Sequence, residues 1–294
     1  MNENLSTVLG SVVEVFGLIG IAWIYVRRTR VDLASTLRIG MDIFIPCLSF
    51  TAIMDSTIRA RDVGMITAAT LIQIGAGLLI GWIGLSLLRW RPRRELLLPI
   101  AFVNSANLPF PLLLANFGTE GLSLGVLSYT VTNLAIFTIG ILILHGGGKM
   151  RQALREPALW ATLLAGAFRL ADVHPPEMLM RVPRLAGLAA VPLMLVLFGE
   201  SLASTRMTST RQAAAVTLLR YAGGAAALAI TLTLLQPQGL VRKVLILYAL
   251  LPAAMINVVL AQRAGRDAPA VASSVLLTTL VSVALLPILL ALLR

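Results

Sequence analysis

Charged side chains are scarce in this sequence, at 13% of the residues against about 25% in an average soluble domain. Cysteine and histidine are scarcer still. One cysteine excludes an intramolecular disulfide and a cysteine metal cluster, and His145 and His174 lie far apart with no ligand spacing around either. We therefore expect no metal and no cofactor. Aromatic residues are sparse and are not interleaved with a basic patch, which excludes nucleic acid as the expected partner.

Apolar residues, by contrast, make up 58% of the chain. A helix that crosses a bilayer needs about 20 apolar residues. We therefore predict an all-α polytopic membrane protein that contacts lipid. The first segment carries Glu14 and has neither a basic start nor a small-residue cleavage site, so we read it as a retained span. Ten segments fit, the sixth being short: 5–26, 32–54, 63–88, 95–117, 121–144, 157–171, 185–204, 212–235, 240–262 and 268–292.

Basic residues gather in alternate loops between these segments. The odd-numbered loops are rich in arginine and lysine, whereas most even-numbered loops balance arginine with acid. The eighth loop, with Arg242 and Lys243, breaks this pattern. Because cytoplasmic loops carry the excess of positive charge, we expect the odd loops in the cytoplasm and both termini outside it.

The loop charges and the prolines together predict two halves of opposite orientation. We assign residues 1–145 to a first five-helix repeat, 146–156 to a cytoplasmic linker, and 157–294 to a second, inverted repeat. Pro46 and Pro192 are 146 positions apart, and Pro109 and Pro252 are 143 apart. Inverted repeats with broken helices in matching positions are typical of secondary transporters. Coincidence is the alternative, since prolines are common in membrane helices.

The fourth segment contains the most informative stretch, Asn104–Pro111, which holds two asparagines, a serine and two prolines. Proline lacks an N–H group and clashes with the preceding turn, so the helix should break here. A broken helix at membrane depth is tolerated where it is buried in protein or lines a wet cavity. The alternative is a proline-kinked helix whose asparagines bond to neighbouring helices.

Residues at the fourth and ninth segments form our candidate substrate site. Asparagine offers a donor and an acceptor while staying neutral, and a half-helix N-terminus adds about half a positive charge. Such groups suit a small organic anion. Asn257 has a second interpretation, a hydrogen bond between helices. The candidate binding residues are Asn104, Ser105, Asn107, Pro109, Pro111, Pro252 and Asn257.

Ionisable residues inside the segments are candidates for proton coupling or for ion pairs, because burying a charge in a membrane is costly. Arg38 and Asp42 are four positions apart and can pair on one helix face. Glu14 could titrate or face a dimer interface. Glu200 could meet Arg220, as a salt bridge or as a coupling pair.

Two apparent enzyme motifs do not make this chain an enzyme. Gly121–Gly125 spells a hydrolase nucleophile elbow, and His145–Gly148 spells an oxyanion loop. The loop should precede the serine and here follows it, and no strand pattern flanks either motif. We expect no catalytic residue.

Over nearly its whole length the sequence resembles the auxin efflux carrier family, which includes bacterial dicarboxylate carriers of the malonate and malate type. Bile-acid sodium symporters share the architecture. The family usually has glycine where Pro109 stands, which bears on the geometry of the crossing and on the substrate range. The matching stretches are Asn104–Pro111 with Asn116–Gly118, Pro46–Phe50, Pro192–Gly199, Pro252, Leu260–Ala261 and Leu276–Leu280.

The resemblance implies two inverted five-helix repeats whose fourth and ninth helices are broken and cross. A scaffold part would combine helices 1, 2, 6 and 7, and a transport part helices 3–5 and 8–10. It also implies a homodimer formed through the scaffold, a bacterial inner (plasma) membrane location, and substrate contact by Asn104 or Asn107.

The sequence therefore predicts a secondary transporter of a small organic anion, a carboxylate or dicarboxylate, that works by alternating access and is passive or proton-coupled. The alternatives are a sodium-coupled symporter of the bile-acid type and a non-transporting membrane sensor or scaffold. A sodium site would need several converging oxygen ligands. A sensor would not require polar residues at both helix breaks.

Overall fold

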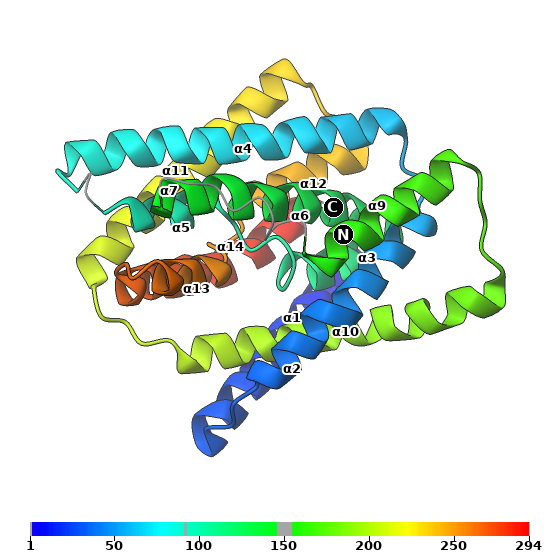
Figure 1. Cartoon of the computed structure of the whole chain (residues 1–294), viewed down its shortest axis with the longest axis horizontal. Coiled ribbons are helices and arrows are strands. Elements are labelled where there is room, and N and C mark those ends of the chain that lie inside the picture. The colour runs from blue at the N-terminus through cyan, green and yellow to red at the C-terminus, as the bar shows by residue number, and fades with distance from the viewer. Residues whose placement is uncertain (1, 91–92, 146–154, 294) are drawn as a thin grey trace.

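The computed structural model describes residues 2–90, 93–145 and 155–293 (Figure 1). The predicted linker at 146–156 thus lies outside the described residues except for its last two positions. The described residues are helical, and the one β-type contact among them is an isolated antiparallel bridge between Val103 and Ala253. The predicted all-α class is confirmed.

The helices follow one another with short connections, and three short segments are 3₁₀ or π turns (η). In chain order they are α1 (Asn2–Thr29), α2 (Ala34–Ile39), η1 (Gly40–Phe44), α3 (Ile45–Met54), α4 (Ala60–Leu87), η2 (Arg94–Leu96), α5 (Leu97–Ala101), α6 (Pro109–Ala135), η3 (Ile136–Gly140), α7 (Ile141–His145), α9 (Pro157–Leu170), α10 (Glu177–Ser204), α11 (Thr210–Leu234), α12 (Gly239–Ala249), α13 (Ile256–Arg263) and α14 (Ala268–Leu293).

Six helical segments of the described chain are long and apolar enough to cross a membrane, which agrees with a polytopic membrane protein. α9 is apolar but shorter. Figure 1 shows α4 and α10 on opposite sides of the molecule, with α5, α6, α13 and α14 between them. The six segments are Ala34–Met54, Ala60–Leu87, Pro109–Leu144, Glu177–Ser204, Thr210–Leu234 and Ala268–Leu293.

Two helix boundaries add detail to the predicted segments. α10 begins at Glu177, well before the predicted start at residue 185, and keeps Pro183 inside the helix. The predicted gap between residues 117 and 121 is a kink at Gly118, whose φ of 63° and ψ of −162° interrupt the helical backbone. Glycine adopts this conformation without a steric penalty, so α6 consists of two helices that meet in a kink at Gly118.

Two helices of the bundle end in its interior and resume after a gap. α5 ends at Ala101 and α6 begins at Pro109, while α12 ends at Ala249 and α13 begins at Ile256. Pro109 suits the first position of a helix, where no intrahelical N–H bond is needed. Pro252 lies within the second gap itself, so these two prolines occupy different places in the two breaks.

Close backbone approach joins α4 to α11 and to α5. A Cβ atom on Gly223 of α11 would lie 3.1 Å from the Cα of Gly77 on α4. A Cβ on Gly77 would lie 2.8 Å from the Cα of Ala101, the last residue of α5. Small residues permit such contacts between membrane helices, where packing replaces the hydrophobic effect as the source of stability. The end of α5, where the first break begins, is therefore packed tightly against the backbone of α4.

We predict that Gly77→Ala lowers the melting temperature of the detergent-solubilised protein. The added methyl group meets backbone that cannot move aside, and overpacking of this kind costs roughly 1–3 kcal/mol. Gly75→Ala on the same helix is the control, because a Cβ there meets nothing within 4 Å. Equal losses in the two variants would contradict the close contact between α4 and α5.

Candidate functional site

The two helix breaks are paired with each other by backbone hydrogen bonds. The N–H of Asn104 donates to the carbonyl of Pro252 at 2.8 Å, and the N–H of Ala254 donates to the carbonyl of Phe102 at 3.0 Å. These four residues are buried, so water cannot replace the lost helical bonds. Each break thus supplies the partner that the other needs.

Side chains from neighbouring helices satisfy further backbone groups of the breaks. The hydroxyl of Thr278 on α14 accepts from the N–H of Ala253 at 3.2 Å, and Ser282 donates to the carbonyl of Leu250 at 2.8 Å. The Tyr248 hydroxyl donates to the carbonyl of Ser105 at 3.1 Å. These bonds fix the shape of both gaps from the α12 and α14 side.

Arg220 of α11 is a charged residue that contacts this backbone, and it is 1% exposed. Its Nη2 donates to the carbonyls of Tyr248, Ala249 and Leu251, at 3.4, 3.4 and 3.1 Å. The last carbonyls of a helix have no intrahelical partner and carry a negative partial charge. Arg220 therefore neutralises the C-terminal end of α12.

This arrangement differs from a pairing of Arg220 with Glu200. Glu200 instead accepts a hydrogen bond from Ser204 at 2.9 Å, on the same helix. Among the described residues, no ion pair joins Glu200 to an arginine. The partners of Arg220 are backbone carbonyls. The sequence shows which side chains carry charge, but it does not show which backbone groups lie near them.

A cavity of about 190 Å³ lies beside the paired breaks. Both breaks line it, together with α6, η3, the α2–η1 segment and the residue before α9. Its polar lining residues are Asn104, Ser105, Asn107, Tyr129, Thr132, Asn133 and Glu156.

A second, more open hollow of about 500 Å³ lies next to this cavity, and we call it the vestibule. The C-terminal end of α10, the loop after it, α13 and the start of α14 line the vestibule. Leu37 and Asn107 line both hollows. They therefore stand at the boundary between the vestibule and the cavity.

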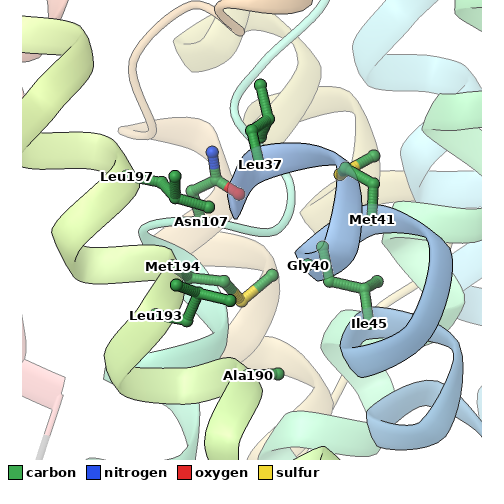
Figure 2. Close-up of a pocket in the computed structure, with 9 residues that line it drawn as sticks. All are labelled: Leu37, Gly40, Met41, Ile45, Asn107, Ala190, Leu193, Met194 and Leu197. Carbon is green, nitrogen blue, oxygen red and sulfur yellow. The ribbon is translucent and has the colours of Figure 1, made fainter. Parts of the chain in front are cut away.

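Asn107 projects from the first break toward a small apolar recess between η1 and α10. Figure 2 shows its amide between Leu37 and Leu197, as the polar side chain among nine labelled residues. Its backbone N–H donates to Oδ1 of Asn104 at 3.1 Å, which sets the turn of the break. Its side-chain amide has no hydrogen-bond partner among the described residues and is half-buried. Asn107 thus presents an unused donor and acceptor to both hollows.

The other predicted binding residues lie close by but do not line the cavity. Pro109 and Pro111 are buried in the first turn of α6, and Pro252 is buried in the second break. Asn257 is fully buried, and its Nδ2 donates to the carbonyl of Phe102 at 3.0 Å. Of the predicted set, Asn104, Ser105 and Asn107 are the cavity residues.

The predicted charged residues are spread over several elements. Arg38 and Asp42 are both exposed and do not form an ion pair in the described structure. Glu14 is exposed on α1, and Glu200 lines the vestibule.

Four polar residues that line the cavity were absent from the sequence prediction. Tyr129, Thr132 and Asn133 lie at positions i, i+3 and i+4 of α6, a spacing that places them on one helix face. Asn133 donates to the Tyr129 hydroxyl at 3.0 Å. Glu156 was assigned to the linker, yet it is half-buried before α9. Burial, and then the charge of Asp42, raise the pKa of Glu156 above its ordinary value.

We predict that Arg220→Met destabilises the protein by roughly 1.5–3 kcal/mol, the value of a hydrogen bond to a charged group. The loss arises because the carbonyls of Ala249 and Leu251 would lose the Arg220 donor in an apolar interior. The melting temperature in detergent measures it. Arg211→Met, at an exposed position of the same helix, is the control and should change stability by no more than about 0.5 kcal/mol. Similar melting temperatures for both variants would show that Arg220 is dispensable to the break.

Comparison of the sequence with known proteins places this chain in a family. A model of the family described as "Membrane transport protein" matches residues 7–153 and 147–290. A protein of Methanothermobacter thermautotrophicus (strain Delta H) described as an uncharacterized transporter is 29% identical over 295 residues, covering 95% of this chain and 92% of the relative. The chain therefore belongs to the membrane transport protein family, the auxin efflux carrier-like family that its motifs resemble, and it is a transporter of the integral membrane class.

Proposed function

We propose that the protein is a secondary transporter that moves a small organic anion, a carboxylate or dicarboxylate, by alternating access. The cavity bounded by both helix breaks carries this proposal. Its asparagines can donate to a carboxylate without placing a fixed charge in the membrane. α6 and α13 begin directly after the lining segments, and each helix N-terminus contributes about half a positive charge. We expect no enzymatic activity.

The packing of the helices supports two moving parts. α1 packs on α10, and α3 packs between α9 and α10, which forms one group. α4, α5, α11 and α14 pack on one another and form another group, to which both breaks belong. The cavity lies between them, with Leu37 and Met41 on one side and the breaks on the other. We propose that these groups are the scaffold and transport parts, and that a homodimer forms through the scaffold.

Reciprocal contacts support ten spans in two inverted repeats, 1–145 and 157–294. The N–H of Asn104 donates to the carbonyl of Pro252, and the N–H of Ala254 donates to the carbonyl of Phe102. A two-fold relation between the repeats produces such a reciprocal pair of hydrogen bonds. This relation matches Pro252 with Phe102 rather than with Pro109, and it matches Asn257 with Asn107. α4 and α11 also approach closely, since a Cβ on Gly223 would lie 3.1 Å from the Cα of Gly77.

In this proposal, the structure is open to the cytoplasm. The lining of the vestibule includes Arg206 and Thr208, which lie in the predicted seventh, cytoplasmic loop. An anion would enter past Arg206 and reach Asn107, where the vestibule meets the cavity. Glu200 lies on the vestibule wall, and Pro109, Pro111 and Asn257 serve to shape the breaks.

We predict that Asn107→Ala lowers uptake of labelled malonate and malate into proteoliposomes by at least tenfold at low substrate concentration. Loss of a hydrogen bond to a charged group costs about 1.5–3 kcal/mol, which corresponds to roughly 10- to 150-fold in affinity. Gln262→Ala removes an exposed amide from α13 and should leave uptake unchanged.

Unaltered saturable uptake by Asn107→Ala would contradict the proposed site. A requirement for a sodium gradient would favour the sodium-coupled alternative. Absence of saturable uptake by folded wild-type protein would exclude both acids as substrates, and ligand binding without uptake would favour a sensor.

We predict that Arg206→Cys in a Cys47→Ala background resists impermeant thiol reagents in intact cells and reacts after permeabilisation. Its loop is expected in the cytoplasm because odd loops carry the positive excess. Asp172→Cys, exposed in the sixth loop, is the control and should react in intact cells. The opposite labelling pattern would reverse the topology.

A further inference from the structure

The described lining of the cavity carries a negatively charged group, which would repel the proposed anion. Glu156 is the one charged residue among its described lining residues, and no arginine or lysine lines it. An ionised carboxylate in a confined space with few water molecules repels a second carboxylate more strongly than it would in bulk water. An organic anion can therefore share this cavity with Glu156 most readily when Glu156 is protonated.

The surroundings of Glu156 favour that protonated form. Its side chain is half-buried at the start of α9, and no ion pair to it occurs in the described parts of the chain. Asp42 of η1 is the charged group that acts on it, and burial and Asp42 both raise its pKa, in that order. Arg38 on α2 and the adjacent Arg155 are exposed, and α3, which packs along α9, carries no charged residue.

Glu156 also faces polar groups of the transport part. Tyr129 of α6 is close enough to feel its charge, and Tyr129 is bonded to Asn133 at 3.0 Å. All three residues line the cavity together with Asn104 and Asn107. Glu156 precedes a helix of the scaffold group, so movement of the transport part past it would change its surroundings.

We propose that Glu156 couples anion transport to protons: its carboxylate takes up one proton when the anion enters the cavity, and releases that proton when the anion leaves on the other side. This inference rests on the proposed function as an anion carrier. The cargo is then one anion and one proton per cycle, and the O–H bond that forms at Glu156 on loading is the bond that breaks on release. By linkage, a bound proton raises anion affinity and a bound anion raises proton affinity by the same factor.

The sign of the pH dependence follows. Below the raised pKa, Glu156 is neutral and the anion binds. Above it, the side chain must first take up a proton, so anion affinity falls about tenfold per pH unit when one proton enters with each anion. Glu156→Gln mimics the neutral form and should bind the anion with little dependence on pH.

The test uses labelled malonate and proteoliposomes of the full chain. In wild type, an inward proton gradient should drive accumulation above equilibrium. Glu156→Gln should keep malonate exchange across the membrane at equal concentrations, yet lose gradient-driven accumulation entirely. Asp42→Asn removes a neighbouring negative charge that raises the pKa of Glu156. The pH midpoint of malonate exchange by this variant should therefore be lower than that of the wild type. This second variant keeps Glu156 in place, and therefore tests the proposal even if Glu156→Gln does not fold.

Gradient-driven accumulation by Glu156→Gln, or an unchanged midpoint in Asp42→Asn, would overturn the proposal. Saturable wild-type uptake that ignores the proton gradient but is lost in Asn107→Ala would overturn the coupling alone and leave the anion carrier standing. Absence of any saturable malonate uptake or exchange by folded wild type would overturn both.

Discussion

The structure depends on one constraint: backbone N–H and C=O groups buried in an apolar interior must find partners within the protein. Two helices are interrupted, at Phe102–Leu108 and Leu250–Met255, so the backbone groups there lose their intrahelical hydrogen bonds. They meet the constraint by bonding to each other, and Thr278, Ser282, Tyr248 and Arg220 satisfy carbonyls and an N–H that remain. Most of the polar residues around the breaks serve the backbone in this way. Among the described residues, the side chain of Asn107 makes no hydrogen bond, because its backbone N–H and Oδ1 of Asn104 already complete the turn. In the function that we propose, this side chain contacts the substrate.

Electrostatics divides the same region into two zones. The buried cation Arg220 is engaged by the carbonyls at the end of α12 and lies away from the cavity lining. The cavity itself has amides, hydroxyls and one carboxylate. No arginine or lysine is among the described lining residues, so the anion that we propose as substrate would bind weakly and reversibly. Release is as necessary to a carrier as capture, and the neutral amide site and neighbouring Glu156 that we propose would serve both.

Sequence reasoning located the breaks because proline and asparagine in an apolar run have a direct physical meaning: a missing N–H and an exposed amide. It placed Asn104, Ser105 and Asn107, which do line the cavity. It missed Tyr129 and Asn133, because polar residues on one face of an apolar helix also fit helix packing. Glu156 was missed because a charged residue next to a linker normally lies in solvent. Pro109 begins α6 whereas Pro252 lies inside the second gap, a difference that spacing along the chain does not reveal.

The contact of Gly77 with Gly223 also bears on how the protein is made. Gly223 follows Gly77 by 146 residues, so α4 is synthesised long before its partner exists. Until α11 arrives, Gly77 lacks the helix that packs against it, and the break after α5 lacks the Pro252 carbonyl that accepts from Asn104. The first half is therefore inserted into the membrane in an unfinished form. The backbone hydrogen bonds of the first break and the packing of Gly77 on α11 are completed only when the later helices have been inserted.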